Sequence, residues 1–139
     1  MRGDLAGAVE HLRRVVEISP DNPQALNNLA YLLAEYRQKP DEALAYAEKA
    51  HELAPDNPEL ADTLGWVLYR KGLYREALPQ LERAASQSPN AVWKYHLAMA
   101  YAKFGDQKRG RAALDAALKL NPNVPEAKMA QALLGGDKK

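Results

Sequence analysis

Cysteine is absent from the 139-residue sequence, so disulfide bonds and thiolate metal ligands are both excluded. The sequence also has no run of eighteen apolar residues, which is the length that a membrane-spanning helix needs. Nineteen Lys and Arg residues against eighteen Asp and Glu residues leave a formal net charge of +1. A balanced chain attracts neither nucleic acid nor an anionic membrane surface strongly. We therefore expect no nucleic-acid partner and no membrane insertion.

The amino-terminal segment MRGDLAGAVEHL has charged residues where a secretory signal peptide needs an apolar centre. We therefore expect a soluble chain without a signal peptide, and the sequence leaves open whether its compartment is the cytoplasm or the periplasm. Runs of β-branched residues are almost missing, whereas alanine, leucine and charged residues dominate. These are good helix formers, so the composition predicts an all-α protein.

Groupings of residues that perform catalysis are also missing. His11, His51 and His96 have no partner at the spacing of metal ligands. The segment GDQKRGR (residues 105–111) lacks the Lys-Ser/Thr ending of a phosphate-binding loop, and a predicted helix rather than a strand precedes it. No Ser-His-Asp or paired-carboxylate arrangement stands out. We expect no metal ion, no cofactor and no enzymatic activity.

Proline, in contrast, is abundant, and its spacing is regular. Pro20, Pro55, Pro89 and Pro122 are separated by 35, 34 and 33 residues. A period of this length is typical of solenoids built from repeated helix pairs. Each period contains two helical patterns of apolar residues. The predicted helices are residues 24–36, 41–53, 59–71, 75–87, 91–104 and 107–120.

These periods resemble the tetratricopeptide repeat, in which a small residue follows a leucine in the first helix and alanines and a proline follow in the second. In the middle period the matching residues are Leu64, Gly65, Leu68, Gly72, Tyr74, Ala77, Leu81, Ala84 and Pro89. Comparable matches occur in the flanking periods, for example at Leu29, Ala30, Ala43 and Ala47, and at Leu97, Ala98, Tyr101 and Ala117. The resemblance implies a right-handed superhelical solenoid of antiparallel helix pairs.

The resemblance covers nearly the whole chain and implies one domain over residues 1–139. A solenoid hides its last apolar face beneath a terminal cap, and the carboxyl-terminal segment VPEAKMAQALL suits that role. The expected parts are a half-repeat with only a second helix (1–20), three repeats (21–55, 56–89 and 90–122), a capping helix (123–134) and a disordered tail (135–139).

First helices in this family line a concave groove. The resemblance therefore implies that the side of each first helix that faces away from the apolar core binds a partner peptide or helix. In the helix expected over residues 59–71, Trp66 and Tyr69 share a side with Glu59 and Asp62. The apolar side of this helix is formed by other residues, namely Leu60, Leu64, Val67 and Leu68. They can face the groove or pack on a neighbouring repeat, and we favour the groove because an exposed aromatic patch usually signals binding. The expected groove residues are Asn27, Asn28, Tyr31, Asp62, Trp66, Tyr69, Arg70, Tyr95, Met99 and Lys103.

Some members of the family hold the acidic carboxyl terminus of a chaperone with a clamp of Lys, Arg and Asn. That clamp lacks its cations here, so we do not expect this ligand. The matching positions in this sequence are Asn27, Tyr31, Thr63, Val92 and His96.

Self-assembly is an alternative to peptide binding. The half-repeat has an apolar stripe and no first helix of its own, so a second copy could cover it and form a homo-oligomer. The candidate residues are Leu5, Val9, Leu12 and Val16. The repeats also resemble those of long bacterial arrays, some of them in lipoproteins tied to exopolysaccharide secretion, which implies a bacterial source and leaves the partner unidentified.

Overall fold

The structure is a computed structural model that describes residues 2–36 and 38–135. Of the expected disordered tail, residues 136–139 lie outside the described residues. The described residues form eight α-helices and no strand. The helices are α1 (Arg2–Ile18), α2 (Pro23–Glu35), α3 (Pro40–Leu53), α4 (Pro58–Arg70), α5 (Tyr74–Gln87), α6 (Ala91–Phe104), α7 (Gln107–Leu120) and α8 (Pro125–Leu134).

The same short signal starts each first helix. Asn22, Asn57 and Asn90 stand immediately before α2, α4 and α6, and each side chain accepts a hydrogen bond from a backbone N–H two or three residues further on. Proline follows the asparagine at the start of α2 and α4, where its fixed φ suits the first helical turn. The helix boundaries predicted from the sequence therefore agree with the structure to within one or two residues.

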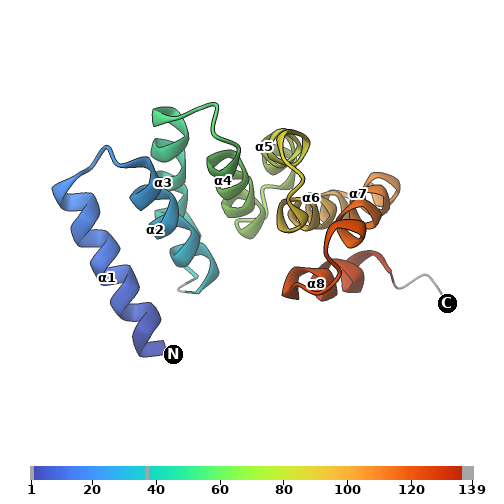
Figure 1. Ribbon diagram of the computed structural model, residues 1–139, viewed down its shortest axis with the longest axis horizontal. Coiled ribbons are helices and arrows are strands. Elements are labelled where there is room, and N and C mark those ends of the chain that lie inside the picture. The colour runs from blue at the N-terminus through green and yellow to red at the C-terminus, as the bar shows by residue number, and fades with distance from the viewer. Residues whose placement is uncertain (1, 37, 136–139) are drawn as a thin grey trace.

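Successive helices pack in antiparallel pairs, α2 with α3, α4 with α5 and α6 with α7. The first helices also contact one another, α2 with α4 and α4 with α6, while α8 packs on α6 and α7. Figure 1 shows the chain running from α1 on the left to α8 beneath α6 on the right. The chain is an all-α, right-handed superhelical solenoid of antiparallel helix pairs, as predicted from the sequence.

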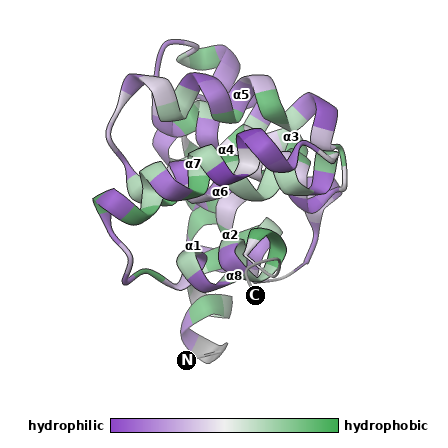
Figure 2. Cartoon of the chain, turned by 90° about the vertical axis from the view of Figure 1, so that its right-hand side faces the viewer, coloured by the Kyte–Doolittle hydropathy of each residue, from purple (hydrophilic) through white to green (hydrophobic). Residues whose placement is uncertain are grey.

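The apolar core follows the length of the solenoid instead of filling one centre. One cluster of buried residues extends from α1 to α6, a second joins α4 and α6 to α7 and α8, and a small third lies between α2, α3 and α4. Figure 2 shows hydrophilic and hydrophobic residues mixed along the outer helices, as expected for helices that are buried on one side. The central helix α4 differs, because its residues 60–68 are all buried. Stability therefore depends on contacts between neighbouring repeats.

Gly65 allows α4 to approach α5 closely. A Cβ atom at this position would lie 2.6 Å from Cγ of Leu81 and 3.2 Å from the carbonyl oxygen of Ala77. Gly110 has the same role between α7 and α6, since a Cβ there would lie 3.3 Å from the carbonyl oxygen of Ala98, and it would also lie 2.8 Å from Cδ2 of Leu134 on α8. Both glycines are therefore required by helix packing and not by backbone conformation.

Substitution of Gly65 tests this packing. We expect Gly65→Ala to lower the free energy of unfolding by about 1–3 kcal/mol, because the added methyl group overpacks the α4–α5 contact. The matched control is Gly7→Ala in α1, where a Cβ would meet nothing within 4 Å. That change should raise the stability by roughly 0.5–1 kcal/mol through helix propensity. Urea denaturation followed by circular dichroism measures both, and equal effects at the two sites would contradict the packing role of Gly65.

Candidate functional site

Two hollows lie on the face shared by α2, α4 and α6, called here the first-helix face. The first hollow, of about 440 Å³, lies between α2, α4 and α6 and is also bordered by α1. Its lining residues are Leu12, Asn27, Asn28, Tyr31, Leu32, Glu59, Asp62, Thr63, Val92, Trp93 and His96. The second hollow, of about 360 Å³, lies near the carboxyl-terminal ends of the first helices, where α3 and α5 begin. It is lined by Ala34, Gln38, Pro40, Tyr69, Arg70, Tyr74 and Lys103.

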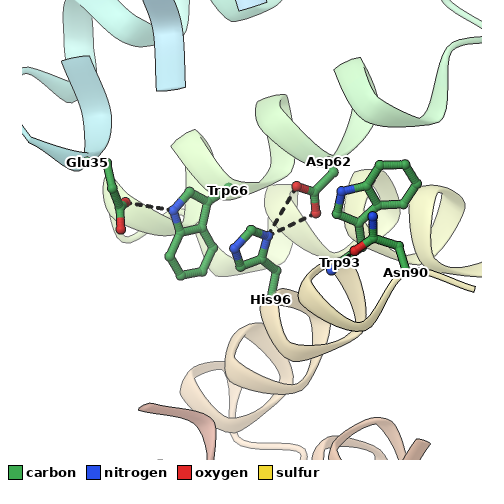
Figure 3. A network of polar contacts seen from close by, with 6 residues as sticks. All are labelled: Glu35, Asp62, Trp66, Asn90, Trp93 and His96. Carbon is green, nitrogen blue, oxygen red and sulfur yellow. Dashed lines mark hydrogen bonds and ion pairs between the residues drawn. The ribbon is translucent and has the colours of Figure 1, made fainter. Parts of the chain in front are cut away.

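Polar side chains beside the hollows join neighbouring first helices. The indole N–H of Trp66 on α4 donates a hydrogen bond of 2.8 Å to Oε1 of Glu35 on α2. Nδ1 of His96 on α6 lies 3.0 and 3.1 Å from the two carboxylate oxygens of Asp62 on α4. Figure 3 shows both contacts along the same side of α4. These bonds fix the positions of three consecutive first helices relative to one another.

The ring of Trp66 is enclosed by its neighbours. It stacks on the imidazole of His96, with a centroid distance of 3.9 Å, and on the ring of Tyr69, at 4.6 Å. The residue is only 1% exposed. The prediction that Trp66 faces an open groove is therefore wrong, because adjacent first helices are close enough for its ring to fill the space between them. It packs between the repeats.

Two other predicted groove residues need the same correction. Tyr95 is 0% exposed, and its hydroxyl donates a hydrogen bond of 2.6 Å to the carbonyl oxygen of Asn121. Met99 is 1% exposed and belongs, like Trp66, to a core cluster that α8 completes. These side chains extend beneath the first-helix face and meet α7 and α8, so they support the surface instead of forming it.

The other seven predicted groove residues line the hollows. Four of them, Asn27, Asn28, Tyr31 and Asp62, line the first hollow, although Asn27 and Asp62 are themselves buried. The remaining three line the second hollow, and they are Tyr69, Arg70 and Lys103. The five positions matched to the family's carboxylate clamp all line the first hollow, namely Asn27, Tyr31, Thr63, Val92 and His96.

Trp93 and Glu59 also line the first hollow, and neither is among the groove residues predicted from the sequence. Trp93 lies one helical turn before His96 on α6, and residues three apart share a helix face. Glu59 lies three residues before Asp62, in the first turn of α4. Helical spacing, continued by one turn toward the start of each helix, is therefore the signal that indicates both residues.

Burial raises the pKa of two tyrosines that line the hollows, Tyr31 and Tyr69. Burial raises the pKa of Tyr31 well above its usual value, and the carboxylates of Glu35, Glu126 and Asp62 raise it further. Burial likewise raises the pKa of Tyr69 to about 12. Both phenols therefore remain protonated at neutral pH and can donate or accept a hydrogen bond.

Two residues that line the first hollow each have a buried polar atom without a hydrogen-bond partner in the described part of the chain. The atoms are Oδ1 of Asn27 and Nε2 of His96. A buried polar atom without a partner costs about 1–3 kcal/mol, so such atoms are uncommon in folded proteins. Both belong to residues of the same hollow, although the atoms themselves are enclosed by the protein.

Most of the apolar residues on one side of α1 pack against the core of the chain itself. Val9 is buried in the first core cluster, and Leu12 and Val16 pack against that cluster. Leu5 is half-buried. Arg13 on α1 also pairs with Glu42 on α3, and this contact lowers the pKa of the Glu42 carboxyl. Self-association through this stripe stays a prediction, although fewer of its residues are available than the sequence suggested.

Within residues 2–36 and 38–135, no cluster of three or more His, Asp or Glu side chains is arranged to hold a metal ion. None of the helices described there is both long and apolar enough to cross a membrane.

Family profiles described as tetratricopeptide repeat match residues 21–90 and 63–127, and one described as TPR repeat matches residues 2–35. A TPR repeat-containing protein of Pseudomonas aeruginosa is 36% identical over 96 residues, which are 69% of this chain and 16% of that protein. Cellulose synthase operon protein C of Pseudomonas fluorescens is 30% identical over 131 residues, 88% of this chain and 10% of that protein. The chain thus spans only a small part of the length of these relatives.

Solved structures with the same fold include YrrB, described as a TPR protein with an unusual peptide-binding site. It superposes with a TM-score of 0.76 and 23% identity, and the match covers 94% of this chain and 68% of YrrB. The thermophilic TPR protein TTC0263 of Thermus thermophilus gives a TM-score of 0.77 with 21% identity, over 95% of this chain and 74% of that one. MamA of Desulfovibrio magneticus gives 0.73 with 23% identity, over 97% and 84%. At these identities the likeness shows a shared fold.

Substitution of Trp66 tests whether its ring packs between repeats. We expect Trp66→Ala to lower the free energy of unfolding by about 3–5 kcal/mol, because a large buried ring is lost. Trp66→Phe keeps a ring for stacking and loses the hydrogen bond to Glu35, so a smaller loss of about 1–3 kcal/mol is expected. Urea denaturation measures both losses. A Trp66→Ala variant as stable as the wild type would show instead that the ring is exposed.

Proposed function

Because the chain belongs to the tetratricopeptide repeat family, we propose that it is a non-catalytic scaffold that binds a segment of a partner polypeptide on its first-helix face. The observation that carries this proposal is the pair of hollows on that one face. Seven of the ten residues predicted to bind a partner line them. The partner segment is an extended peptide or a helix, the two forms that such grooves accept.

The first hollow has the composition of a recognition site. Its volume of about 440 Å³ lies in the range of small-ligand pockets. Leu32 and Val92 supply apolar contact, while Tyr31 and Trp93 supply aromatic surface with few rotatable bonds. Tyrosine and tryptophan are the residues that most often dominate binding energies in protein interfaces. Polar groups from α2, α4 and α6 lie between them and can set the register of a bound segment.

The likeness to YrrB supports the same proposal. That protein is described as having a peptide-binding site, and it shares the fold of this chain. The relatives in Pseudomonas are long proteins, and this chain matches a small part of each. We propose that the chain provides the protein-binding function of such an array, and the identity of its partner is for experiment to determine.

Self-association through α1 is the competing proposal. It has less support, because Val9, Leu12 and Val16 already pack within the chain. Sedimentation at high protein concentration tests it directly. A monomer at every concentration would end this proposal and leave peptide binding untouched.

A matched pair of tyrosines tests the proposed binding face. Tyr31 lines the first hollow, whereas Tyr36, at the end of the same helix, is 53% exposed and lines neither hollow. For peptides selected from a display library on the wild-type chain, we expect Tyr31→Ala to weaken binding by about tenfold or more, as for other aromatic hot spots. Tyr36→Ala should leave binding unchanged.

Fluorescence anisotropy with labelled peptides measures the affinities, and circular dichroism checks that both variants stay helical. Selected peptides that bind the two variants equally would contradict a site on the first-helix face.

A further inference from the structure

The first hollow has a negative electrostatic character. Two carboxylates, those of Glu59 and Asp62, line it, and none of the described lining residues is lysine or arginine. The second hollow differs, because Arg70 and Lys103 line it and no carboxylate is among its described lining residues. The influence of Glu126 and Asp62 on the pKa of Tyr31 agrees with a negative field around the first hollow. An anionic ligand group is therefore disfavoured there and a cationic group is favoured.

The amide oxygen of Asn27 is an acceptor without a partner among the described residues. Its Nδ2 donates a hydrogen bond of 3.3 Å to Oε2 of Glu59, and because a carboxylate can only accept, this contact fixes which way the amide is turned. Oδ1 is then left without a partner among the described residues, although Asn27 is only 3% exposed. The free group of this buried amide is thus an acceptor.

The imidazole of His96 also has an unpartnered nitrogen. Its Nδ1 faces both carboxylate oxygens of Asp62. Nε2, on the other side of the ring, has no partner in the described part of the chain. His96 is 1% exposed and comes from α6, whereas Asn27 comes from α2. The hollow is therefore lined, from three helices, by two carboxylates and by two residues that each have an unpartnered polar atom.

We propose that the first hollow receives an arginine side chain of the partner segment. A guanidinium group has five N–H donors in one plane and no acceptor, which suits a hollow lined by the carboxylates of Glu59 and Asp62 and by the amide of Asn27. It also stacks on aromatic faces, and Tyr31 and Trp93 line this hollow. Figure 3 shows Trp93 beside Asp62, so an aromatic surface and a carboxylate lie next to each other. Lysine supplies fewer donors and no plane, so it fits less well.

This inference rests on the proposed function, since it names the chemistry of the segment that the first-helix face binds. A random peptide library displayed on phage and selected on the full chain provides the probes. Peptides whose binding is lost on Tyr31→Ala are kept as groove-dependent. We expect these peptides to share an arginine at one fixed position, and its replacement by citrulline, which has the same shape without the charge, to weaken binding roughly tenfold or more.

Charge-neutral variants of the chain complete the test. Glu59→Gln and Asp62→Asn keep an acceptor for Asn27 and His96, and they should weaken the arginine peptide severalfold while hardly affecting the citrulline peptide. The matched control is Glu76→Gln, which removes an exposed carboxylate from α5 and should change neither. Circular dichroism verifies that all three variants are folded.

The outcomes separate the two proposals. Groove-dependent peptides without a shared arginine, or with equal affinity after citrulline replacement, would overturn the arginine site and leave peptide binding in place. A selection that yields no groove-dependent peptide would overturn the proposed function and the arginine site together. A shared lysine that binds as tightly as arginine would show a cation site without the planar recognition proposed here.

Discussion

The contact between neighbouring first helices is the constraint on which the rest of the structure depends. Trp66 stands at its centre, stacked between His96 and Tyr69 and hydrogen-bonded to Glu35. Through this one side chain α4 is tied to α2 on one side and to α6 on the other. Because a repeat in a solenoid touches only its neighbours, these contacts, together with the packing of α3 on α4 and of α5 on α6, set the relative rotation of successive repeats. The shape of the first-helix face follows from that rotation.

The helices and their pairing could be predicted because their signals are local. An asparagine cap, a proline in the first turn and a glycine or proline at the turn act within a few residues, and they recur at a period of 33 to 35 residues. The repeat pattern likewise places a small residue at Gly65, where α4 approaches Leu81 of α5 closely. Fold class and helix boundaries therefore follow from short-range chemistry.

The binding face could be predicted only in part, because burial there depends on how far apart neighbouring repeats lie. Periodicity places Tyr31 and Trp66 at equivalent positions on α2 and α4, yet Tyr31 is half-buried at a hollow and Trp66 is enclosed. The difference comes from what lies opposite each ring. The ring of Trp66 stacks on His96, which lies 30 residues further along the chain. The core cluster that contains Trp66 also includes residues of α8. No pattern within a single helix reports such a partner. The same limit explains Tyr95, whose hydroxyl finds the carbonyl of Asn121 on the next loop.

The residues that line the first hollow belong to three successive repeats. Asn27 is on α2, Asp62 is on α4 and His96 is on α6. A partner segment that fills this hollow contacts the first and third repeats together, so its affinity depends on the curvature of the superhelix between them. The coupling between ligand affinity and the curvature of the superhelix is reciprocal. A bound ligand would stiffen the array at one curvature, and a force that bends the array would change how tightly the ligand is held.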